Sequence, residues 1–464
     1  MFINFTCIFH INYLFLGEFH KIYGDRLMGQ INPEAEALNH IINETHPVIY
    51  RLLSEKGKRI FFPRKGTIQQ ANEAKGKDIN ATIGMAIEDN KTPMRLSAIS
   101  DNVSLDPEKV FPYAPSHGII ELRKTWQNLI KEKNPSLKED ISLPVVTNGI
   151  THGLSVAGYL FMDPGDRVIL PDLFWGNYRL LFEHAYDVSF QHFNTFLSDG
   201  FDTESLGIVL SENRGKQILI LNFPHNPTGY SPTNETMEKI VAKIHESAEN
   251  GNEIAVMTDD AYFGLTYKEN LFQESIFSKL ADLHENVLAI KIDGATKEDY
   301  VWGFRVGFIT YASKGITEQV CQALENKTAG RIRGNISNAA HISQSLLLKA
   351  LNSPNYEEEK GKKRDVLKAR FDRVHNVLAK NEKKYSPFFS PLPYNSGYFM
   401  CVRLVENLDP ETVRQTLLKK FSTGVLATGK LLRIAFSSVA EKDISNLFEN
   451  IYNACKMHHE KDSE

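Results

Sequence analysis

The chain has 464 residues, of which 42% are hydrophobic and 24% charged, and its formal net charge at pH 7 is −4. This length is too great for one simple core and predicts a large domain with a smaller partner. The weak net charge argues against nucleic acid or an anionic membrane as a partner. The four cysteines are scattered without metal-ligand spacing, which predicts no metal site and indicates reduced thiols in a cytoplasmic protein.

Residues 1–27 are rich in Phe, Ile and Leu and differ in composition from the rest of the chain. The stretch is short for a membrane span, and it lacks the basic start and small-residue cleavage site of a signal peptide. We expect an N-terminal extension of uncertain order, with Met28 as an alternative first residue. A signal peptide is the competing interpretation.

Helices and strands alternate through the middle of the chain. Apolar residues at three- and four-residue spacing predict a helix from Pro33 to about Lys56, and similar patterns predict helices at 119–133 and from Thr151. Short apolar runs predict strands at 143–146, 168–170, 218–221, 254–257, 287–292 and 306–311. This alternation predicts an α/β fold with a mostly parallel central sheet, whose functional loops follow the carboxyl ends of the strands.

The pattern changes after about residue 352. A charged helical stretch precedes predicted strands at 396–405 and 430–439 and a final amphipathic helix. We expect this part to form a smaller α+β domain that the N-terminal helix completes. The predicted boundaries are 28–79 for the N-terminal part of the small domain, 80–350 for the large domain and 351–464 for the C-terminal small domain.

Residues suited to one cofactor follow the predicted strands. In GATKEDYVWGFRVG, residues 294–307, Lys297 lies eight residues before Arg305. A desolvated lysine can bond an aldehyde, and an arginine can bind a phosphate through two parallel hydrogen bonds. The pair therefore indicates pyridoxal phosphate, which carries both groups. A lysine and an arginine at this spacing are also common in ordinary surface loops.

Three further residues could contact the ring of such a cofactor. Asp259 ends a predicted strand and could pair with the pyridine nitrogen, and Asn226, in PHNPTG, could donate to the ring hydroxyl. Trp175 follows another strand and could stack on the ring. Each also has a simpler interpretation, which is an acidic loop for Asp259, a turn for Asn226 and a core aromatic for Trp175.

The phosphate and the substrate need anchors of their own. NGITHG, residues 148–153, supplies a glycine turn into a helix, where backbone N–H groups and the Thr151 hydroxyl can hold a phosphate. Arg433, on a predicted strand, is a candidate for the substrate's carboxylate, with a surface arginine as the alternative.

These elements occur in one known order, and the chain resembles the class I/II aminotransferases of the fold-type I pyridoxal phosphate enzymes over roughly residues 80–440. The resemblance is carried by several short motifs. They are Tyr113 with Gly118 and the pair Leu122–Arg123, the glycine turn at 149–151, PGD at 164–166, Trp175 with Tyr178, PxNPTG at 224–229, DDAY at 259–262 and KxxxxxGxRxG at 297–307.

The resemblance implies a role for each matched residue. Lys297 bonds the cofactor and then acts as general base, and Asp259 pairs with the ring nitrogen under the stacked Trp175. Asn226 and Tyr262 bind the ring oxygen, and Asn226 also faces the substrate. The implied phosphate-binding residues are Gly149, Ile150, Thr151, Thr296 and Arg305, and those for the substrate carboxylate are Gly84 and Arg433.

Two residues are implied to act across a homodimer with shared active sites. Tyr113 resembles a tyrosine that reaches the phosphate of the neighbouring subunit. Arg333, in IRGNISN at 332–338, resembles the arginine with which the partner subunit of aspartate and aromatic aminotransferases binds a distal carboxylate. A structural or surface role is the alternative for Arg333.

The chain departs from the family pattern beside Lys297. Gly294 replaces a serine that commonly donates to the phosphate, and the acidic pair Glu298 and Asp299 follows the lysine directly. These departures argue against assuming the substrate of any one subfamily.

The predicted reaction moves an amino group from an L-amino acid, aspartate or an aromatic amino acid among the candidates, to 2-oxoglutarate. The amino acid displaces Lys297 from the cofactor, freed Lys297 transfers the α-proton, and a 2-oxo acid leaves before the second substrate reacts, which is a ping-pong mechanism. A carbon–sulfur lyase or a β-decarboxylase would keep the same residues. A regulator's ligand-sensing domain is a more distant alternative, because residues 1–80 lack a DNA-binding helix-turn-helix pattern.

Overall fold

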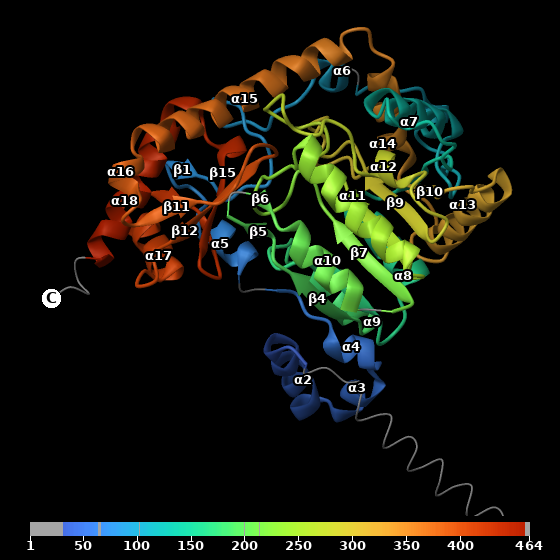
Figure 1. Cartoon of the computed structure of the whole chain (residues 1–464), viewed down its shortest axis with the longest axis horizontal. Coiled ribbons are helices and arrows are strands. Elements are labelled where there is room, and N and C mark those ends of the chain that lie inside the picture. The colour runs from blue at the N-terminus through green and yellow to red at the C-terminus, as the bar shows by residue number, and fades with distance from the viewer. Residues whose placement is uncertain (1–30, 64–65, 102, 199, 213, 460–464) are drawn as a thin grey trace, which may run out of the picture.

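The computed structural model describes residues 31–459 with gaps at 64–65, 102, 199 and 213 (Figure 1). The predictions for residues 1–27 and for Met28 lie outside the described residues. Within the described part of the chain, no helix is both long enough and apolar enough to cross a membrane.

Seven strands of the described residues form a central sheet in the order β2-β10-β9-β8-β7-β3-β4. The strands are β2 (Val145–Thr147), β3 (Arg167–Pro171), β4 (Ser189–Phe193), β7 (Lys216–Leu221), β8 (Glu253–Asp259), β9 (Val287–Asp293) and β10 (Gly307–Ala312). β10 runs antiparallel to both neighbours, and every other pair is parallel. The predicted α/β fold with a mostly parallel central sheet is confirmed.

Helices cover both faces of this larger sheet. On β7, Ile218 and Ile220 share an apolar cluster with α8 (Ile150–Phe161), whereas Leu219 and Leu221 belong to the cluster that contains α10 (Thr203–Glu212) and α11 (Asn234–Glu249). Successive side chains of a strand point to opposite faces, so a strand covered on both sides is apolar throughout. This burial explains why the central strands are recognisable as continuous apolar runs.

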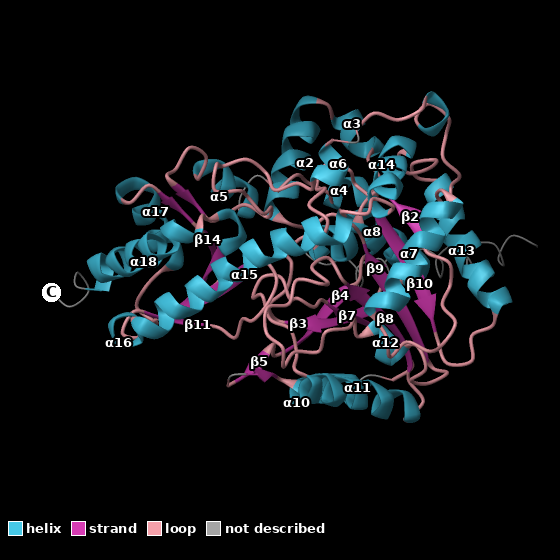
Figure 2. Ribbon diagram, turned by 90° about the horizontal axis from the view of Figure 1, so that it is seen from above, coloured by secondary structure: helices cyan, strands magenta, loops and turns pink. Residues whose placement is uncertain are grey.

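A second described sheet, of four antiparallel strands, forms the smaller unit in the order β11-β12-β15-β14. Its strands are β11 (Phe389–Pro391), β12 (Phe399–Leu404), β14 (Leu426–Thr428) and β15 (Leu431–Ala435). The helices packed around it are α15 (Tyr356–Lys380), α17 (Pro410–Lys420) and α18 (Ile444–His459). Figure 2 shows α15 running from this sheet toward the larger unit.

The single helix predicted from Pro33 to about Lys56 is wrong. The structure has α2 (Pro33–Thr45), α3 (Pro47–Leu52) and α4 (Glu55–Arg59) instead. Pro47 has no N–H to continue the first helix, and His46 before it takes an extended φ of −145°. Ser54 caps α4 by accepting from the Gly57 N–H.

The segment expected to join the smaller domain divides between the two units. α5 (Thr67–Glu73) packs against β14, and β1 (Ile79–Asn80) pairs with β13 (Thr423–Gly424) of the smaller unit. Helix α4 instead contacts α9 (His184–Tyr186) of the larger unit, where Arg59 Nη1 lies 2.5 Å from Asp187 Oδ1. Figure 1 shows α2 to α4 beside β4 and α9 and away from the smaller sheet.

The loop after β7 meets the smaller sheet at a glycine. The Gly229 carbonyl accepts from the N–H groups of Asn395 and Ser396, both at 2.8 Å. A Cβ at Gly229 would lie 1.9 Å from the Phe399 carbonyl oxygen, and its φ of +71° favours glycine. Two backbone segments therefore approach each other more closely here than any other residue allows.

We expect Gly229→Ala to destabilise the protein by about 3 kcal/mol or more, because the opposing atom belongs to buried backbone. Gly315→Ala is the matched control, since Gly315 has the same φ of +71° but no atom within 4 Å of its Cβ position. In the control, the free energy of unfolding should fall by only about 1 kcal/mol, because only the unfavourable backbone conformation contributes. Urea unfolding of both variants measures the difference, and equal losses would contradict the role of the close contact.

Candidate active site

Loops at the carboxyl ends of the central strands surround a cavity. The residues that line it are Ile150, Thr151, Trp175, Asn222, Asn226, Asp259, Ala261, Tyr262, Thr296, Lys297 and Arg305. Nine of these eleven are residues that the sequence predicts for the site, and Asn222 and Ala261 are additions. Segments from five different strand ends are thus brought together in one place, as expected for an α/β sheet.

Lys297 lies in the irregular loop between β9 and β10. Its Nζ donates to the Gly84 carbonyl at 3.2 Å and lies 5.3 Å from the centre of the Tyr262 ring. Burial and the nearby Arg305 charge lower the pKa of Lys297 from 10.5 to about 8, while Asp259 opposes the shift. Lys297 is therefore partly a neutral amine near neutral pH, the form that a nucleophile or a general base requires.

Asp259 is the last residue of β8 and is buried. Its Oδ2 accepts from the Tyr178 hydroxyl at 2.5 Å, and its Oδ1 accepts from the Ala261 N–H at 3.2 Å. Burial raises the pKa of Asp259 to about 6, although the hydrogen bond from Tyr178 acts to lower it. The carboxylate is thus held in one orientation, ready to pair with a cationic ring nitrogen.

Tyr178 and Asn222 are site residues that the sequence analysis did not assign. Tyr178 entered it only as a companion of Trp175 in one motif, although it holds Asp259. Asn222 donates through Nδ2 to the Asp259 carbonyl at 2.6 Å and accepts from the Asn226 N–H at 2.8 Å. The position of Asn222 directly after a buried strand, four residues before Asn226, was the available signal.

Two buried polar atoms in the cavity lack hydrogen-bond partners among the described residues. They are Asn226 Oδ1 and Thr296 Oγ1. Buried polar atoms are nearly always paired, so unpaired ones at a cavity indicate a ligand with complementary groups. Tyr262 is also buried there, which raises the pKa of its phenol and keeps the hydroxyl protonated as a hydrogen-bond donor.

Arg305 reaches the start of α8 because two glycines leave room. Gly149 is the N-terminal cap of α8, with a φ of +80°, and a Cβ there would lie 2.6 Å from Arg305 Nη2. A Cβ at Gly307 would lie 2.8 Å from the Ile150 nitrogen. The guanidinium and the positive end of the helix therefore meet at one point, an arrangement suited to a phosphate.

Gly294 occupies the position where the family often has serine. A Cβ at Gly294 would lie 2.6 Å from the Val306 carbonyl oxygen and 2.8 Å from the Gly307 Cα. β10 therefore fills the space that a serine side chain would need. The unpaired Thr296 hydroxyl, two residues further on, is the nearby donor that the loop offers instead.

The residues present fit pyridoxal phosphate. Arg305, Thr296 and the start of α8 would hold the phosphate, and Asp259 would hold the ring nitrogen. Asn226 and Tyr262 would face the ring oxygen. Lys297 supplies the amine and Trp175 a flat apolar surface, so each part of the cofactor has a counterpart at this cavity.

Arg433 lies on β15, outside the set of residues that line the cavity. Its Nη2 donates to the Thr82 carbonyl at 3.4 Å, and its guanidinium carbon lies 4.4 Å from the centre of the Phe399 ring. Its buried Nε has no partner among the described residues. The charge of Arg433 contributes to the lowered pKa of Lys297 and opposes the raised pKa of Tyr262, so it acts electrostatically on the cavity.

Tyr113 and Arg333 lie away from the cavity of their own chain. The Tyr113 side chain is 89% exposed, and exposed Arg333 donates to Ser337 Oγ at 2.7 Å. Their two segments are held together, because Ser116 Oγ donates to the Ser337 carbonyl at 2.9 Å. Both residues therefore belong to one surface of the molecule.

Comparisons with known proteins agree with this geometry. Residues 78–451 match the family model for aminotransferase class I and II. A probable N-acetyl-LL-diaminopimelate aminotransferase of Bacillus subtilis is 27% identical over 65% of this chain and 69% of the relative. An aspartate aminotransferase of Pyrococcus horikoshii is 24% identical over 83% of this chain and 93% of the relative. The crystal structure of an aminotransferase from Anaerococcus prevotii has a TM-score of 0.75 at 23% identity, covering 84% of this chain and 96% of that one.

The charges around Lys297 predict opposite effects of two substitutions on its pKa. Asp259→Asn removes a negative charge that raises this pKa and should lower it, whereas Arg305→Met removes a positive charge that lowers it and should raise it. The pH dependence of Lys297 acylation in the cofactor-free protein, followed by peptide mass spectrometry, measures the midpoint. We expect about 8 for the unmodified sequence.

Exposed Lys362 provides an internal control in the same digest, because its midpoint should stay the same in both variants. If the acylation midpoint of Lys297 moved in the same direction in both variants, the electrostatic assignment would be contradicted. An acylation midpoint of Lys297 equal to that of Lys362 in the unmodified protein would contradict it as well.

Proposed function

The chain belongs to the aminotransferase class I and II family and is a pyridoxal phosphate-dependent aminotransferase, and from that premise we propose a donor class, a set of site roles and an assembly. The proposed reaction moves the amino group of a dicarboxylic or aromatic L-amino acid to 2-oxoglutarate. The observation that carries the site roles is the convergence of Lys297, Asp259, Asn226 and Arg305 on one cavity.

Lys297 is the proposed proton carrier. When bound, the cofactor supplies an electron sink for the electron pair that remains when the substrate's α-proton is removed. Lys297 takes that proton as a neutral amine, which its lowered pKa of about 8 makes available near neutral pH. Asp259 keeps the ring nitrogen cationic, and Tyr178 holds Asp259 in place through its 2.5 Å hydrogen bond.

Substrate orientation is assigned to the smaller unit and to the glycine loop before it. Arg433 binds the α-carboxylate, for which its unpaired Nε is free among the described residues. The Gly84 carbonyl accepts from Lys297 Nζ at 3.2 Å, so this loop lies directly at the reacting amine. The α-carbon is thereby held between Arg433 and Lys297, which is the geometry that proton abstraction needs.

A homodimer with shared active sites completes the proposal. Phe111 and Tyr113 are 83% and 89% exposed, and Ile336 and Ile342 nearby are 37% and 42% exposed. Large apolar side chains exposed together favour burial against another subunit. In such a dimer Tyr113 of the partner subunit reaches the phosphate, and Arg333 of the partner subunit binds the distal carboxylate of a dicarboxylic donor.

We place the enzyme in the cytoplasm on the basis of its thiols. Among the described residues, Cys321, Cys401 and Cys455 are free and buried. Secreted and periplasmic proteins more often hold their cysteines in disulfides.

Arg333→Ala should lower kcat/KM for aspartate about 100-fold, because a dicarboxylate loses one charged partner in the site. The kcat/KM for alanine should be unchanged, since alanine has no distal carboxylate and in a ping-pong mechanism this ratio does not depend on the half-reaction with 2-oxoglutarate, itself a dicarboxylate. A donor screen with 2-oxoglutarate, read as glutamate formed, measures both. Arg373→Ala is the matched control, because Arg373 is another exposed arginine whose Nη2 lies 2.7 Å from a serine hydroxyl, that of Ser445. Equal effects on aspartate and alanine would rule out distal carboxylate recognition.

Shared sites predict that two inactive chains can complement each other. A hybrid dimer of one Lys297→Ala chain and one Arg333→Ala chain contains one site with both residues intact. Its aspartate activity should reach about half that of the unmodified dimer, whereas both parent homodimers stay low. Differently tagged chains, co-expressed and purified through both tags, give the hybrid. No recovery in the hybrid would place Arg333 in the same chain's site or outside any site.

A further inference from the structure

The acidic pair after Lys297 is the centre of a buried charge network. Glu298 accepts from Lys133 Nζ of α7 (Ile120–Lys133) at 2.8 and 2.9 Å, and its Oε1 lies 2.8 Å from Lys360 Nζ of α15. Lys360 Nζ also lies 3.1 Å from Asp299 Oδ1. Two carboxylates and two ammonium groups therefore balance one another beside the active site.

The network is mostly shielded from solvent, since the Asp299 side chain is 1% exposed and those of Lys360 and Glu298 are 11% and 13% exposed, whereas Lys133 is 26% exposed. The Tyr356 hydroxyl, one turn before Lys360 on α15, donates to the same Asp299 oxygen. A Cβ at Gly264 would lie 2.3 Å from Glu298 Oε1, so this glycine, two residues after Tyr262, makes room for the carboxylate. Burial acts against the charged forms, but Lys133 and Lys360 lower the pKa of Glu298, and Asp299 and Glu298 raise that of Lys360.

The loop that carries Lys297 depends on such anchors. It contains two non-glycine residues with positive φ, Tyr300 at 57° and Arg305 at 55°. Such residues cost of order 1 kcal/mol each and persist only when their surroundings hold them. The Tyr398 hydroxyl holds one end by donating to the Lys297 carbonyl at 2.7 Å. Glu298 and Asp299, the next two residues, are held by Lys133 and α15.

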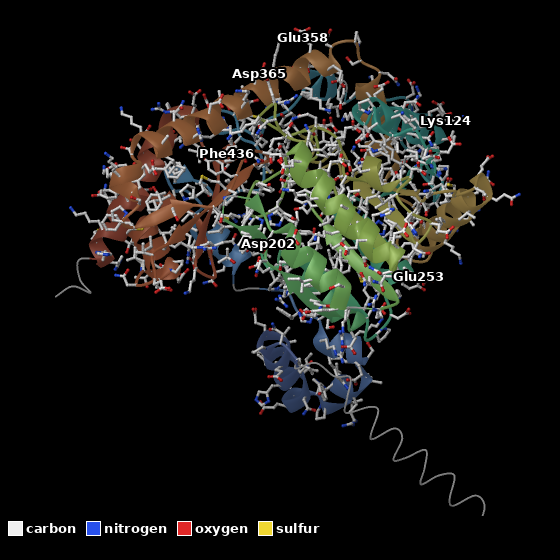
Figure 3. All side chains as sticks on the ribbon, viewed as in Figure 1. Lys124, Asp202, Glu253, Glu358, Asp365 and Phe436 are labelled. Atoms are coloured by element: carbon white, nitrogen blue, oxygen red, sulfur yellow. The ribbon has the colours of Figure 1, made fainter. Side chains whose placement is uncertain are left out.

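Helix α15 joins this loop to the turn that follows the Arg433 strand. Arg370, further along the helix, donates through Nη1 to the Ser437 carbonyl at 2.5 Å, directly after β15. Figure 3 shows Glu358 and Asp365 on the outer side of α15, and both are exposed, whereas Lys360 between them is buried. The same helix thus contacts the Lys297 loop near its start and, near its middle, the 3-10 turn Phe436–Ser438 that follows the Arg433 strand.

We propose that Lys360, with Tyr356, is a positioning residue for the reaction: by holding Glu298 and Asp299 it fixes the Lys297 amine relative to Arg433. This inference deepens the proposed function and rests on the role assigned there to Lys297. Without Lys360, one carboxylate beside Lys297 is left without a balancing charge, and the Tyr356 hydroxyl becomes the one α15 contact to Asp299 that the described residues still supply. The uncompensated carboxylate favours the protonated amine. The lost contact leaves the position of the amine less defined.

The test uses full-length protein with Lys360→Met, which keeps the length of the side chain and removes its charge. In the cofactor-free chain, the midpoint of Lys297 acylation should rise by about 0.5 pH unit or more. In the cofactor-loaded enzyme, amides 299–304 should exchange faster with deuterium, and kcat should fall about 10-fold with little change in donor KM. Lys360→Arg should restore the midpoint.

Two further variants separate positioning from stability. Lys362→Met removes another lysine of α15, whose exposed partner is Glu358 at 2.6 Å, and should change none of these quantities. Tyr356→Phe removes only the hydroxyl on Asp299 and should speed exchange in the same amides. It serves in place of Lys360→Met where that variant fails to fold.

An unchanged Lys297 midpoint and unchanged exchange would overturn the proposal, even with a lower unfolding temperature, since Lys360 would then only stabilise the fold. Failure of the proposed function has a different signature. Lys297→Ala would keep transaminase activity, whereas the midpoint and the exchange rates are measured without turnover.

Discussion

Desolvation of two opposite charges at the ends of neighbouring parallel strands governs this site. Burial penalises the ammonium of Lys297 and the carboxylate of Asp259, so it moves their pKa values toward each other, to about 8 and about 6. Between these values the lysine can exchange a proton while the aspartate is largely ionised. A sheet covered by helices on both faces creates that burial, and the open strand ends still admit a substrate.

The phosphate-binding end of the site also requires backbone segments to lie unusually close together, which glycines permit. Arg305 reaches the start of α8 only because Gly149 and Gly307 lack side chains. Gly294 is fixed by the same packing, since β10 occupies the space beside it. The missing serine is therefore a consequence of how closely β10 lies against the strand before it. With glycine at position 294, the nearby hydroxyl is that of Thr296, and the other proposed phosphate-binding groups stay in place.

The sequence predicted the central strands because each is buried on both faces and appears as an apolar run. β4 was missed, since Ser189–Phe193 is polar at this sheet edge and pairs on one side with β3 among the described strands. Residues that follow strands, such as Asp259 and Asn226, were recognisable for the same reason. Tyr178, Tyr356 and Tyr398 were not assigned roles, because their contacts to Asp259 or the Lys297 loop join residues that are 81, 57 and 101 positions apart. No local pattern encodes such pairings.

Glu298 and Asp299 show how a departure from a family pattern acquires a physical reason. Two carboxylates beside a lysine that must lose its proton would by themselves favour the protonated form. The chain offsets them with Lys133 and Lys360, two cations that reach them from separate helices. Because one of these helices also contacts the turn directly after the strand with Arg433, the compensation links the proposed proton carrier to the proposed carboxylate anchor. The acidic pair and α15 are thus expected to change together, since either alone would leave buried charge uncompensated.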